Sequence, residues 1–191
     1  SSSGQVDLDR TFVITGRERH VASTRVGHLL PYPQRAIRTR DYLYIYNFEP
    51  DRWPIGDPQG LEDLTAEPPP VEEILNEYDS VFPDIDKSPT KAWMIYNRAR
   101  DDVAPLFWLG FGKRPQEELY DLSSDPDYMI NVSAEPGYQS IRESLNVQLM
   151  NVLLTQNDPR VTESPVRFEH EPFSGPVSDS WMLEAFGTTR I

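Results

Sequence analysis

The chain of 191 residues contains no cysteine. Disulfide bonds, thiolate metal sites and cysteine nucleophiles are therefore excluded within it. Long apolar runs are missing too, since no stretch approaches the ~20 residues that a membrane-spanning helix needs. The first residues, Ser1 to Gly4, lack the basic and apolar regions of a signal peptide. If the protein is exported, we expect its signal to lie outside this chain.

Positive charge is scarce, with 18 lysine and arginine residues against 31 acidic ones and a net charge of −13. Nucleic acid and an anionic membrane both require a basic footprint, so we expect neither as a partner. An acidic chain can still carry a local basic patch, and six arginines gather between residues 17 and 40: Arg17, Arg19, Arg25, Arg35, Arg38 and Arg40. This patch is the first candidate for contact with an anion.

Sequence motifs of self-contained enzymes are also absent. The chain has no HExxH, no GxSxG, no phosphate-binding glycine loop and no EF-hand spacing of carboxylates. Its three histidines are His20, His28 and His170, and their spacing favours structural or solvent-exposed roles over a metal site. We therefore expect no catalytic residue and no metal ligand set within this chain.

The apolar pattern predicts a small sheet with packed helices. With 38% apolar residues and 18 prolines, the chain should form one domain with a modest aromatic core, or one domain with a long tail. We expect strands at 11–15, 34–39, 42–48 and 117–122, and helices that begin at 71 and 88 and cover 136–154. The segment 101–115 is expected to be rich in turns, and 160–191 to be an extended tail anchored by Phe168, Phe173, Trp181 and Phe186.

Two packing details follow from periodicity. The strand at 42–48 alternates, with Leu43 and Ile45 on one face and three tyrosines on the other, so we expect a strand or helix to cover the Leu43 and Ile45 face. The helix from 88 is expected to bury Trp93 and Met94, and the helix from 136 to bury an apolar stripe. The members of that stripe are Ile141, Leu145, Leu149, Val152 and Leu153.

The short segment Arg17-Glu-Arg-His20 follows the first predicted strand with four ionisable side chains in a row. Such a run is commonly a solvated loop. The alternative is a loop at a strand end whose charges face an anionic ligand, because strand ends are where α/β folds place ligands.

Three segments of the chain carry motifs whose order is informative. The first is Gly16-Arg-Glu-Arg-His20 leading to Tyr32-Pro-Gln-Arg-Ala-Ile-Arg38. The second is Arg35-Ala-Ile-Arg-Thr-Arg-Asp-Tyr-Leu-Tyr-Ile45 with the exit Asn47-Phe-Glu-Pro-Asp-Arg-Trp-Pro54. The third is Glu118-Leu-Tyr-Asp-Leu-Ser-Ser-Asp-Pro126, a long amphipathic helix and Asn157-Asp-Pro-Arg160. In this order, over roughly residues 4 to 160, the three segments resemble the C-terminal portion of a sulfatase, in the branch similar to heparan N-sulfatase (N-sulfoglucosamine sulfohydrolase).

The resemblance implies an alkaline-phosphatase-like α/β fold for the whole protein, of which this segment is an α+β part. It divides the chain into 1–33, the end of the catalytic domain with a substrate-rim loop, 34–160, the C-terminal subdomain, and 161–191, an extended tail. The family's nucleophile is a formylglycine in a C/S-x-P-x-R motif, used with calcium. This chain contains no such motif. Both groups would lie in the missing N-terminal catalytic domain, and the chain alone should be inactive.

The resemblance also implies substrate-binding residues. Glu18 and His20 match the E-x-H of the N-sulfatase-like branch, and Arg17 and Arg19 are adjacent. The expected ligand is a sulfated carbohydrate or another sulfate ester, whose oxygens suit arginine, and the family implies a periplasmic or secreted protein. Two other functions stay open: a non-catalytic carbohydrate- or protein-binding module derived from a sulfatase, and a phosphate- or phosphonate-ester hydrolase of the same superfold.

Overall fold

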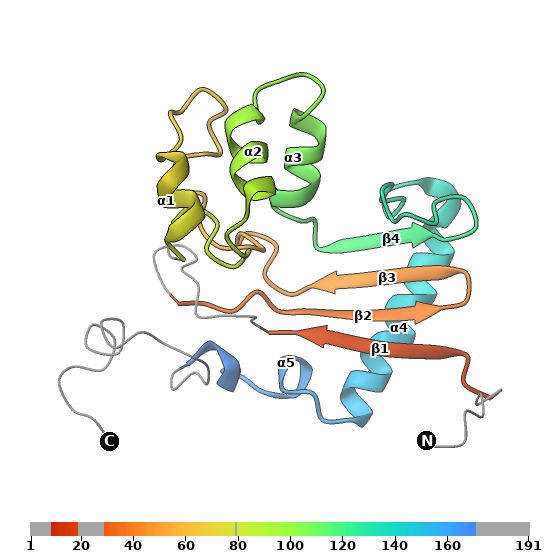
Figure 1. Cartoon of the computed structure of the whole chain (residues 1–191). Coiled ribbons are helices and arrows are strands. Elements are labelled where there is room, and N and C mark those ends of the chain that lie inside the picture. The colour runs from red at the N-terminus through yellow and green to blue at the C-terminus, as the bar shows by residue number, and fades with distance from the viewer. Residues whose placement is uncertain (1–8, 19–28, 79, 171–191) are drawn as a thin grey trace, which may run out of the picture.

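A four-stranded antiparallel sheet is the centre of the fold, in the strand order β1-β2-β3-β4 (Figure 1). The computed structural model describes residues 9–18, 29–78 and 80–170. The strands are β1 (Phe12–Arg17), β2 (Gln34–Thr39), β3 (Tyr42–Asn47) and β4 (Glu117–Asp121). All four expected strands are present, and together with the helices they confirm the α+β class.

One long helix, α4 (Gln139–Thr155), crosses behind all four strands and is preceded by the short 3-10 turn η1 (Pro136–Tyr138). Leu145, Leu149 and Leu153 lie at helical spacing on its buried face, as the sequence predicted. They pack on a row of paired residues that crosses the sheet, since Ile14 is opposite Ile37, Ile37 opposite Tyr44, and Tyr44 opposite Leu119.

The face of β3 that α4 covers is the tyrosine face, and the expectation that Leu43 and Ile45 would be covered was wrong. Tyr44 is fully buried. Its ring joins the core while its hydroxyl donates to Glu117 Oε1 at 2.6 Å and accepts from Asn146 Nδ2 at 2.6 Å. A tyrosine whose hydroxyl is paired at both ends can be buried without a desolvation cost. Burial and the Glu117 carboxylate raise the pKa of Tyr44, which keeps its hydroxyl neutral.

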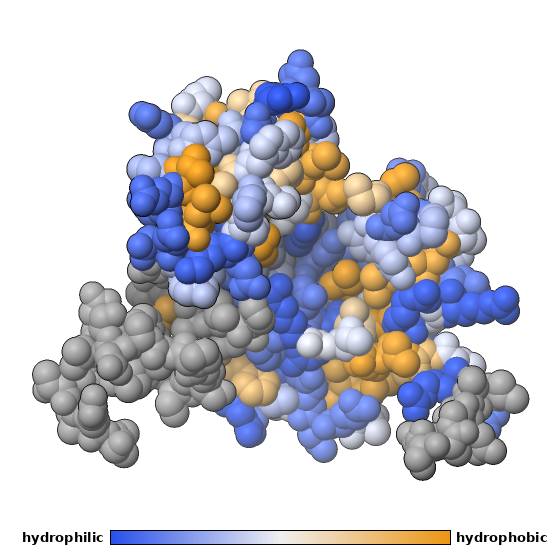
Figure 2. Space-filling view, viewed as in Figure 1, coloured by the Kyte–Doolittle hydropathy of each residue, from blue (hydrophilic) through white to orange (hydrophobic). Residues whose placement is uncertain are grey.

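The opposite face of the sheet is turned to the viewer in Figure 2 and carries apolar surface. Val13 is exposed there, while Leu43 and Ile45 are partly buried. Two-layer antiparallel sheets commonly place polar residues on their open face. The open face of this sheet is therefore more apolar than a solvated face requires.

A second core lies between three shorter helices above the sheet, α1 (Val71–Asn76), α2 (Pro89–Asn97) and α3 (Ala104–Phe111). Phe82, in the loop between α1 and α2, packs edge-on against Phe107 and Phe111. The buried Lys91 amine donates to the carbonyls of Phe82 and Ile85 at 3.0 and 3.2 Å, which fixes that loop on α2. Burial lowers the pKa of Lys91 to about 8.

Two expectations about this region were wrong. The segment 101–115, expected to be rich in turns, contains the helix α3. Burial of its large apolar side chains around Phe82 stabilises this helix despite the local turn signals. Trp93 is 51% exposed, whereas Met94 is partly buried against the second core as expected, and the fully buried residues of α2 are Lys91, Ala92 and Ile95. The N-terminus of α2 is as predicted, with the Ser88 hydroxyl accepting from the Lys91 amide at 3.1 Å.

After α4 the chain forms the single turn α5 (Pro159–Thr162) and the 3-10 turn η2 (Arg167–Glu169), which run beside the end of β1. The expected extended tail thus begins with two short turns, and its anchor Phe168 is partly buried. The other three anchors, Phe173, Trp181 and Phe186, lie outside the described residues. Within the described ranges, no helix is long and apolar enough to cross a membrane. The domain boundaries at 33/34 and 160/161 stay predictions, although β1 pairs with β2 within one sheet.

The contact between α4 and the sheet can be tested with Leu149→Ala. Leu149 is fully buried, so truncation leaves a cavity and should lower the free energy of unfolding by about 2–5 kcal/mol. Leu154→Ala is the matched control, because Leu154 lies on the exposed side of the same helix and should change stability by less than about 0.5 kcal/mol. Urea unfolding followed by circular dichroism measures both, and equal effects would contradict this packing.

Candidate functional site

The candidate site begins where β1 ends, at a glycine that makes room for an arginine. Gly16 is paired with Arg35 on β2. A β-carbon at Gly16 would lie 2.8 Å from Cδ of Arg35, well inside van der Waals contact. The absence of a side chain at Gly16 therefore lets Arg35 cross the edge of the sheet and reach the chain beyond α4.

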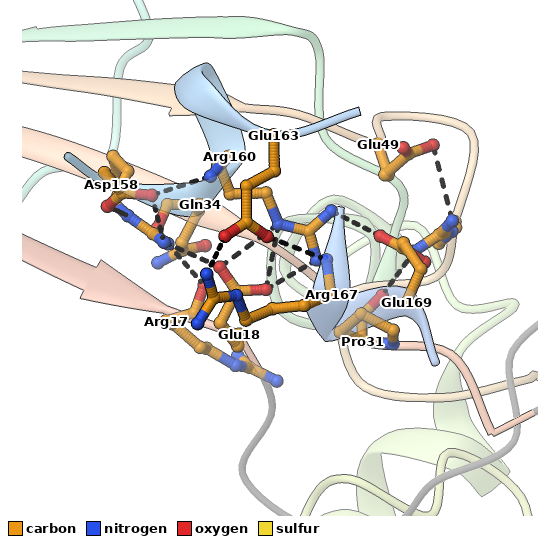
Figure 3. A network of polar contacts seen from close by, with 12 residues as sticks. Arg17, Glu18, Pro31, Gln34, Glu49, Asp158, Arg160, Glu163, Arg167 and Glu169 are labelled. Atoms are coloured by element: carbon orange, nitrogen blue, oxygen red, sulfur yellow. Dashed lines mark hydrogen bonds and ion pairs between the residues drawn. The ribbon is translucent and has the colours of Figure 1, made fainter. Parts of the chain in front are cut away.

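Arg35 is the first of two buried arginines in an ion-pair network. Figure 3 labels its partners Glu18 and Asp158 and the second arginine, Arg160. Its side chain is 8% exposed and donates to both oxygens of Asp158, at 2.6 and 3.0 Å. A further bond of 2.7 Å reaches Glu18 Oε1, and two more reach the carbonyls of Arg17 and Gln34. The guanidinium therefore binds the end of β1 and the turn after α4 at once.

Arg160 is the second buried arginine, with a side chain that is 3% exposed. It donates to both oxygens of Glu18, with its closest contact at 2.5 Å, and to Glu169 Oε1. The carboxylate of Glu18 is thus held between two guanidinium groups that come from β2 and α5. This geometry gives Glu18 a fixed position at the start of the segment 19–28.

The other end of that segment is held by the same network. Arg52 donates to the carbonyl of Pro31 at 3.0 Å and pairs with Glu169 at 2.9 Å. Glu169 in turn pairs with Arg160. Residues 18 and 31, which flank the segment 19–28 in the sequence, are therefore connected through three side chains. We call the set Glu18, Arg35, Arg52, Asp158, Arg160 and Glu169 the arginine network.

Arg17 lies beside the arginine network and points the other way, toward the helices. It donates to Asp84 Oδ2 at 2.6 Å and to the carbonyl of Pro54 at 2.8 Å. The Asp84 side chain is fully buried. This pair ties the end of the sheet to the loops of the second core.

The structure describes two of the four residues that the sequence proposed for substrate binding. Glu18 and Arg17 both hold internal ion pairs, while Arg19 and His20 lie outside the described residues. Contact of all four with a substrate stays a prediction. The sequence analysis missed the roles of Asp158, Arg160 and Glu169, and the only signal for the first two was the Asn157-Asp-Pro-Arg160 match in the resemblance.

Charge in the arginine network is balanced by direct pairing. Burial alone lowers the pKa of Arg35 and of Arg160, but hydrogen bonds from both to carboxylates outweigh it, so both pKa values lie above their ordinary value. Burial raises the pKa of Asp158, but the bonds from Arg35 and from the Arg160 amide outweigh it, so that pKa lies below its usual range. All of these groups are charged at neutral pH.

The residues at this site do not suit a calcium ion. Within 9–18, 29–78 and 80–170, no three carboxylate or histidine side chains come together as a metal site. The carboxylates of the arginine network are already opposed by guanidinium groups, which would repel a divalent cation.

Comparison with known proteins found similarity among solved structures only. No family model matches it, and no curated protein does. Among solved structures, BT4656 in complex with its substrate D-glucosamine-2-N,6-O-disulfate is similar to this chain at 15% identity, with a TM-score of 0.38. The match covers 85% of this chain and 20% of that one, so this chain spans about a fifth of that protein's length. Similarity of this degree identifies neither a family nor an activity.

Removal of the central guanidinium should be costly. Arg35→Met leaves Asp158 without its guanidinium partner and removes one of the donors to Glu18, and the loss of one member of a buried pair costs about 3–5 kcal/mol. The matched control is Arg100→Met, since Arg100 forms an exposed pair with Asp102 and its loss should change stability little. Chemical unfolding of both variants measures the change in the free energy of unfolding. A small change in Arg35→Met would show that the network contributes little to stability.

Acid should weaken the same site. The pKa of Asp158 in the folded chain lies below the value of about 3.9 in the unfolded chain. The unfolded state therefore binds more protons between these values, and the stability that Asp158 contributes above about pH 5 is lost as pH falls through the folded-state pKa. The urea midpoint should fall less steeply between pH 6 and pH 3 in Asp158→Asn than in the parent chain. Asp127→Asn, at an exposed position, should keep the parent's slope.

Proposed function

We propose that this chain is the C-terminal subdomain of a sulfatase-like hydrolase that acts on sulfated sugars, with its nucleophile and calcium site in a preceding domain. The observation that carries the proposal is the convergence of the three segments on which the resemblance rests. Glu18 comes from the first, Arg35 from the first and second, and Asp158 and Arg160 from the third. They are joined in one buried network. Residues that are far apart in the sequence, and that belong to the three segments of the resemblance, thus contribute to one structural feature.

The purpose of this feature is to present the segment 19–28. Glu18 is fixed at its start by Arg35 and Arg160, and the carbonyl of Pro31, just beyond its end, is fixed by Arg52. A substrate-binding loop needs ends that hold their position while its tip meets the ligand. In the proposed function, Glu18 is a positioning residue, and the substrate contacts come from the segment that follows.

The charges on that segment suit a sulfated ligand. Arg17, Arg35 and Arg160 are engaged by carboxylates of this chain. Contacts to sulfate oxygens would then come from Arg19 and His20, which follow Glu18 directly in the sequence. Arginine binds sulfate with two parallel hydrogen bonds, and protonated histidine adds a further charged donor. A periplasmic or secreted protein would meet such sugars, so export of the parent protein is part of this proposal.

The proposal is tested on the parent protein, with the 191-residue chain as its control. The parent should release sulfate from D-glucosamine-2-N,6-O-disulfate, and the chain alone should release none with calcium added. Release of phosphate from a matched phosphate ester but no sulfate would support a phosphate- or phosphonate-ester hydrolase instead. Sugar binding without turnover by the parent, together with an upstream sequence that lacks C/S-x-P-x-R, would support the non-catalytic module.

Within an active parent, His20→Ala should lower kcat/KM for the sulfated sugar. The loss of one charged hydrogen bond, worth about 1.5–3 kcal/mol, corresponds to about 10- to 150-fold. The melting temperature should stay within about 1 °C of the parent's, because the arginine network is intact. His170→Ala is the matched control and should leave kcat/KM unchanged, since His170 is exposed after η2. Unchanged kinetics in His20→Ala would remove His20 from the site.

A further inference from the structure

A groove runs along the free edge of β1, on the side away from β2. Its volume is about 830 Å³, and its walls are the whole of β1 and the C-terminal end of α4. A second hollow of about 560 Å³ continues it along α4. Both share Phe12, Val152 and Gln156, so the two hollows form one continuous depression. We call it the β1 groove.

The β1 groove has the features of a place for another strand. β1 is an edge strand, since it pairs only with β2 in the described sheet. One edge of its backbone therefore has amide and carbonyl groups without a neighbouring strand. Val13, Thr15 and Gly16 are exposed, and the strand has neither a proline nor a lysine to block pairing. Beside this edge, Phe12 and Val152 provide an apolar floor.

The chain itself offers an occupant that begins at the groove. Phe168 lines the β1 groove together with Glu18, at the end where β1 finishes. The 21 residues after His170 follow directly from there. A chain of that length can extend over ~70 Å, whereas the six residues of β1 span only ~20 Å. The C-terminal residues are therefore long enough to turn at the mouth of the groove and pass along its full length.

One stretch of those residues matches the groove in length and character. Trp181-Met-Leu-Glu-Ala-Phe186 is six residues long, as β1 is, and four of its side chains are large and apolar. It lies between Ser178-Asp-Ser180 and Gly187, which are residues that commonly bound a strand. It contains neither proline nor glycine, in contrast to the preceding Phe173-Ser-Gly-Pro-Val177.

We propose that Trp181–Phe186 binds in the β1 groove as a fifth strand, antiparallel to β1. Entry beside Phe168 and Glu18 brings the chain to the C-terminal end of β1, and its path toward Phe12 gives the antiparallel direction. Backbone hydrogen bonds would satisfy the free edge, and alternate apolar side chains would cover Phe12 and Val152. This strand would protect the edge of the sheet from pairing with other chains.

The absence of native cysteine allows a direct test by disulfide scanning in the full 191-residue chain. Thr15→Cys is combined in turn with Met182→Cys, Leu183→Cys and Glu184→Cys. Neighbouring antiparallel strands bring paired α-carbons within disulfide range, and successive side chains point to opposite faces. We expect one register to form an intramolecular disulfide at least about tenfold faster than its neighbours. Glu62→Cys, at an exposed position in a distant loop, replaces Thr15→Cys in the control pair and should form none.

A second test needs no disulfide. A chain that ends at Ser180 should keep its circular dichroism spectrum, but amide hydrogens of β1 should exchange at least about tenfold faster than in the full chain. A synthetic peptide of residues 178–191 should restore their protection. Unchanged β1 exchange in the shortened chain, or equal crosslinking in all registers, would overturn the proposal. If the cysteines at position 15 of two molecules form a disulfide in a concentration-dependent dimer, the proposal is overturned, because a second copy of the chain then occupies the β1 groove.

Discussion

The buried guanidinium of Arg35 is the constraint on which the arrangement of the chain ends depends. A buried charge is tolerated only where opposite charges and hydrogen bonds replace water. Asp158 is 123 positions away in the sequence and Glu18 is 17 away, yet both lie within 2.7 Å of this group. Three elements must therefore come together at once: the end of β1, the start of β2 and the turn after α4.

This constraint complements the packing of α4. The apolar row from Ile14 to Leu119 fixes which face of the sheet the helix covers, but a stripe of leucines tolerates sliding along its axis. Charged pairs have a direction and a fixed reach, and a two-bond contact to Asp158 determines where the helix must end. Arg17 forms a further directional ion pair, and its bond to buried Asp84 connects the sheet to the helices around Phe82.

Local pattern was sufficient for the elements whose side chains alternate or repeat on one face. The hairpin of β2 and β3, the strand β4 and the helix α4 follow from such patterns. The sequence pattern did not predict burial or helix formation where contacts with residues distant in the sequence determine them. Tyr44 is buried because Glu117 and Asn146 pair with its hydroxyl, and a periodicity argument assigns a tyrosine row to the open face. The helix α3 forms around Phe82, more than twenty residues earlier.

The candidate site shows the same division. Glu18 and Arg17 could be singled out because four charges in a row after a strand are visible in sequence. Their partners could not, since Glu169 and Asp84 are single carboxylates in a chain with 31 acidic residues. Only tertiary contact distinguishes them from solvated acids. What the resemblance added was the position of Asp158 and Arg160, without an account of what they hold.

Electrostatics sets a condition on any anionic ligand of this chain. At physiological ionic strength, charges more than ~8 Å apart in water are largely screened, so the net charge of −13 opposes a polyanion mainly at close range. The arginine network adds no attraction, because its guanidinium groups and carboxylates cancel in pairs. An anion must therefore be held by cations outside the network. The network itself fixes Glu18 and the carbonyl of Pro31, on either side of the segment 19–28. In the proposed function, these fixed positions would lower the cost of ordering that segment against a ligand.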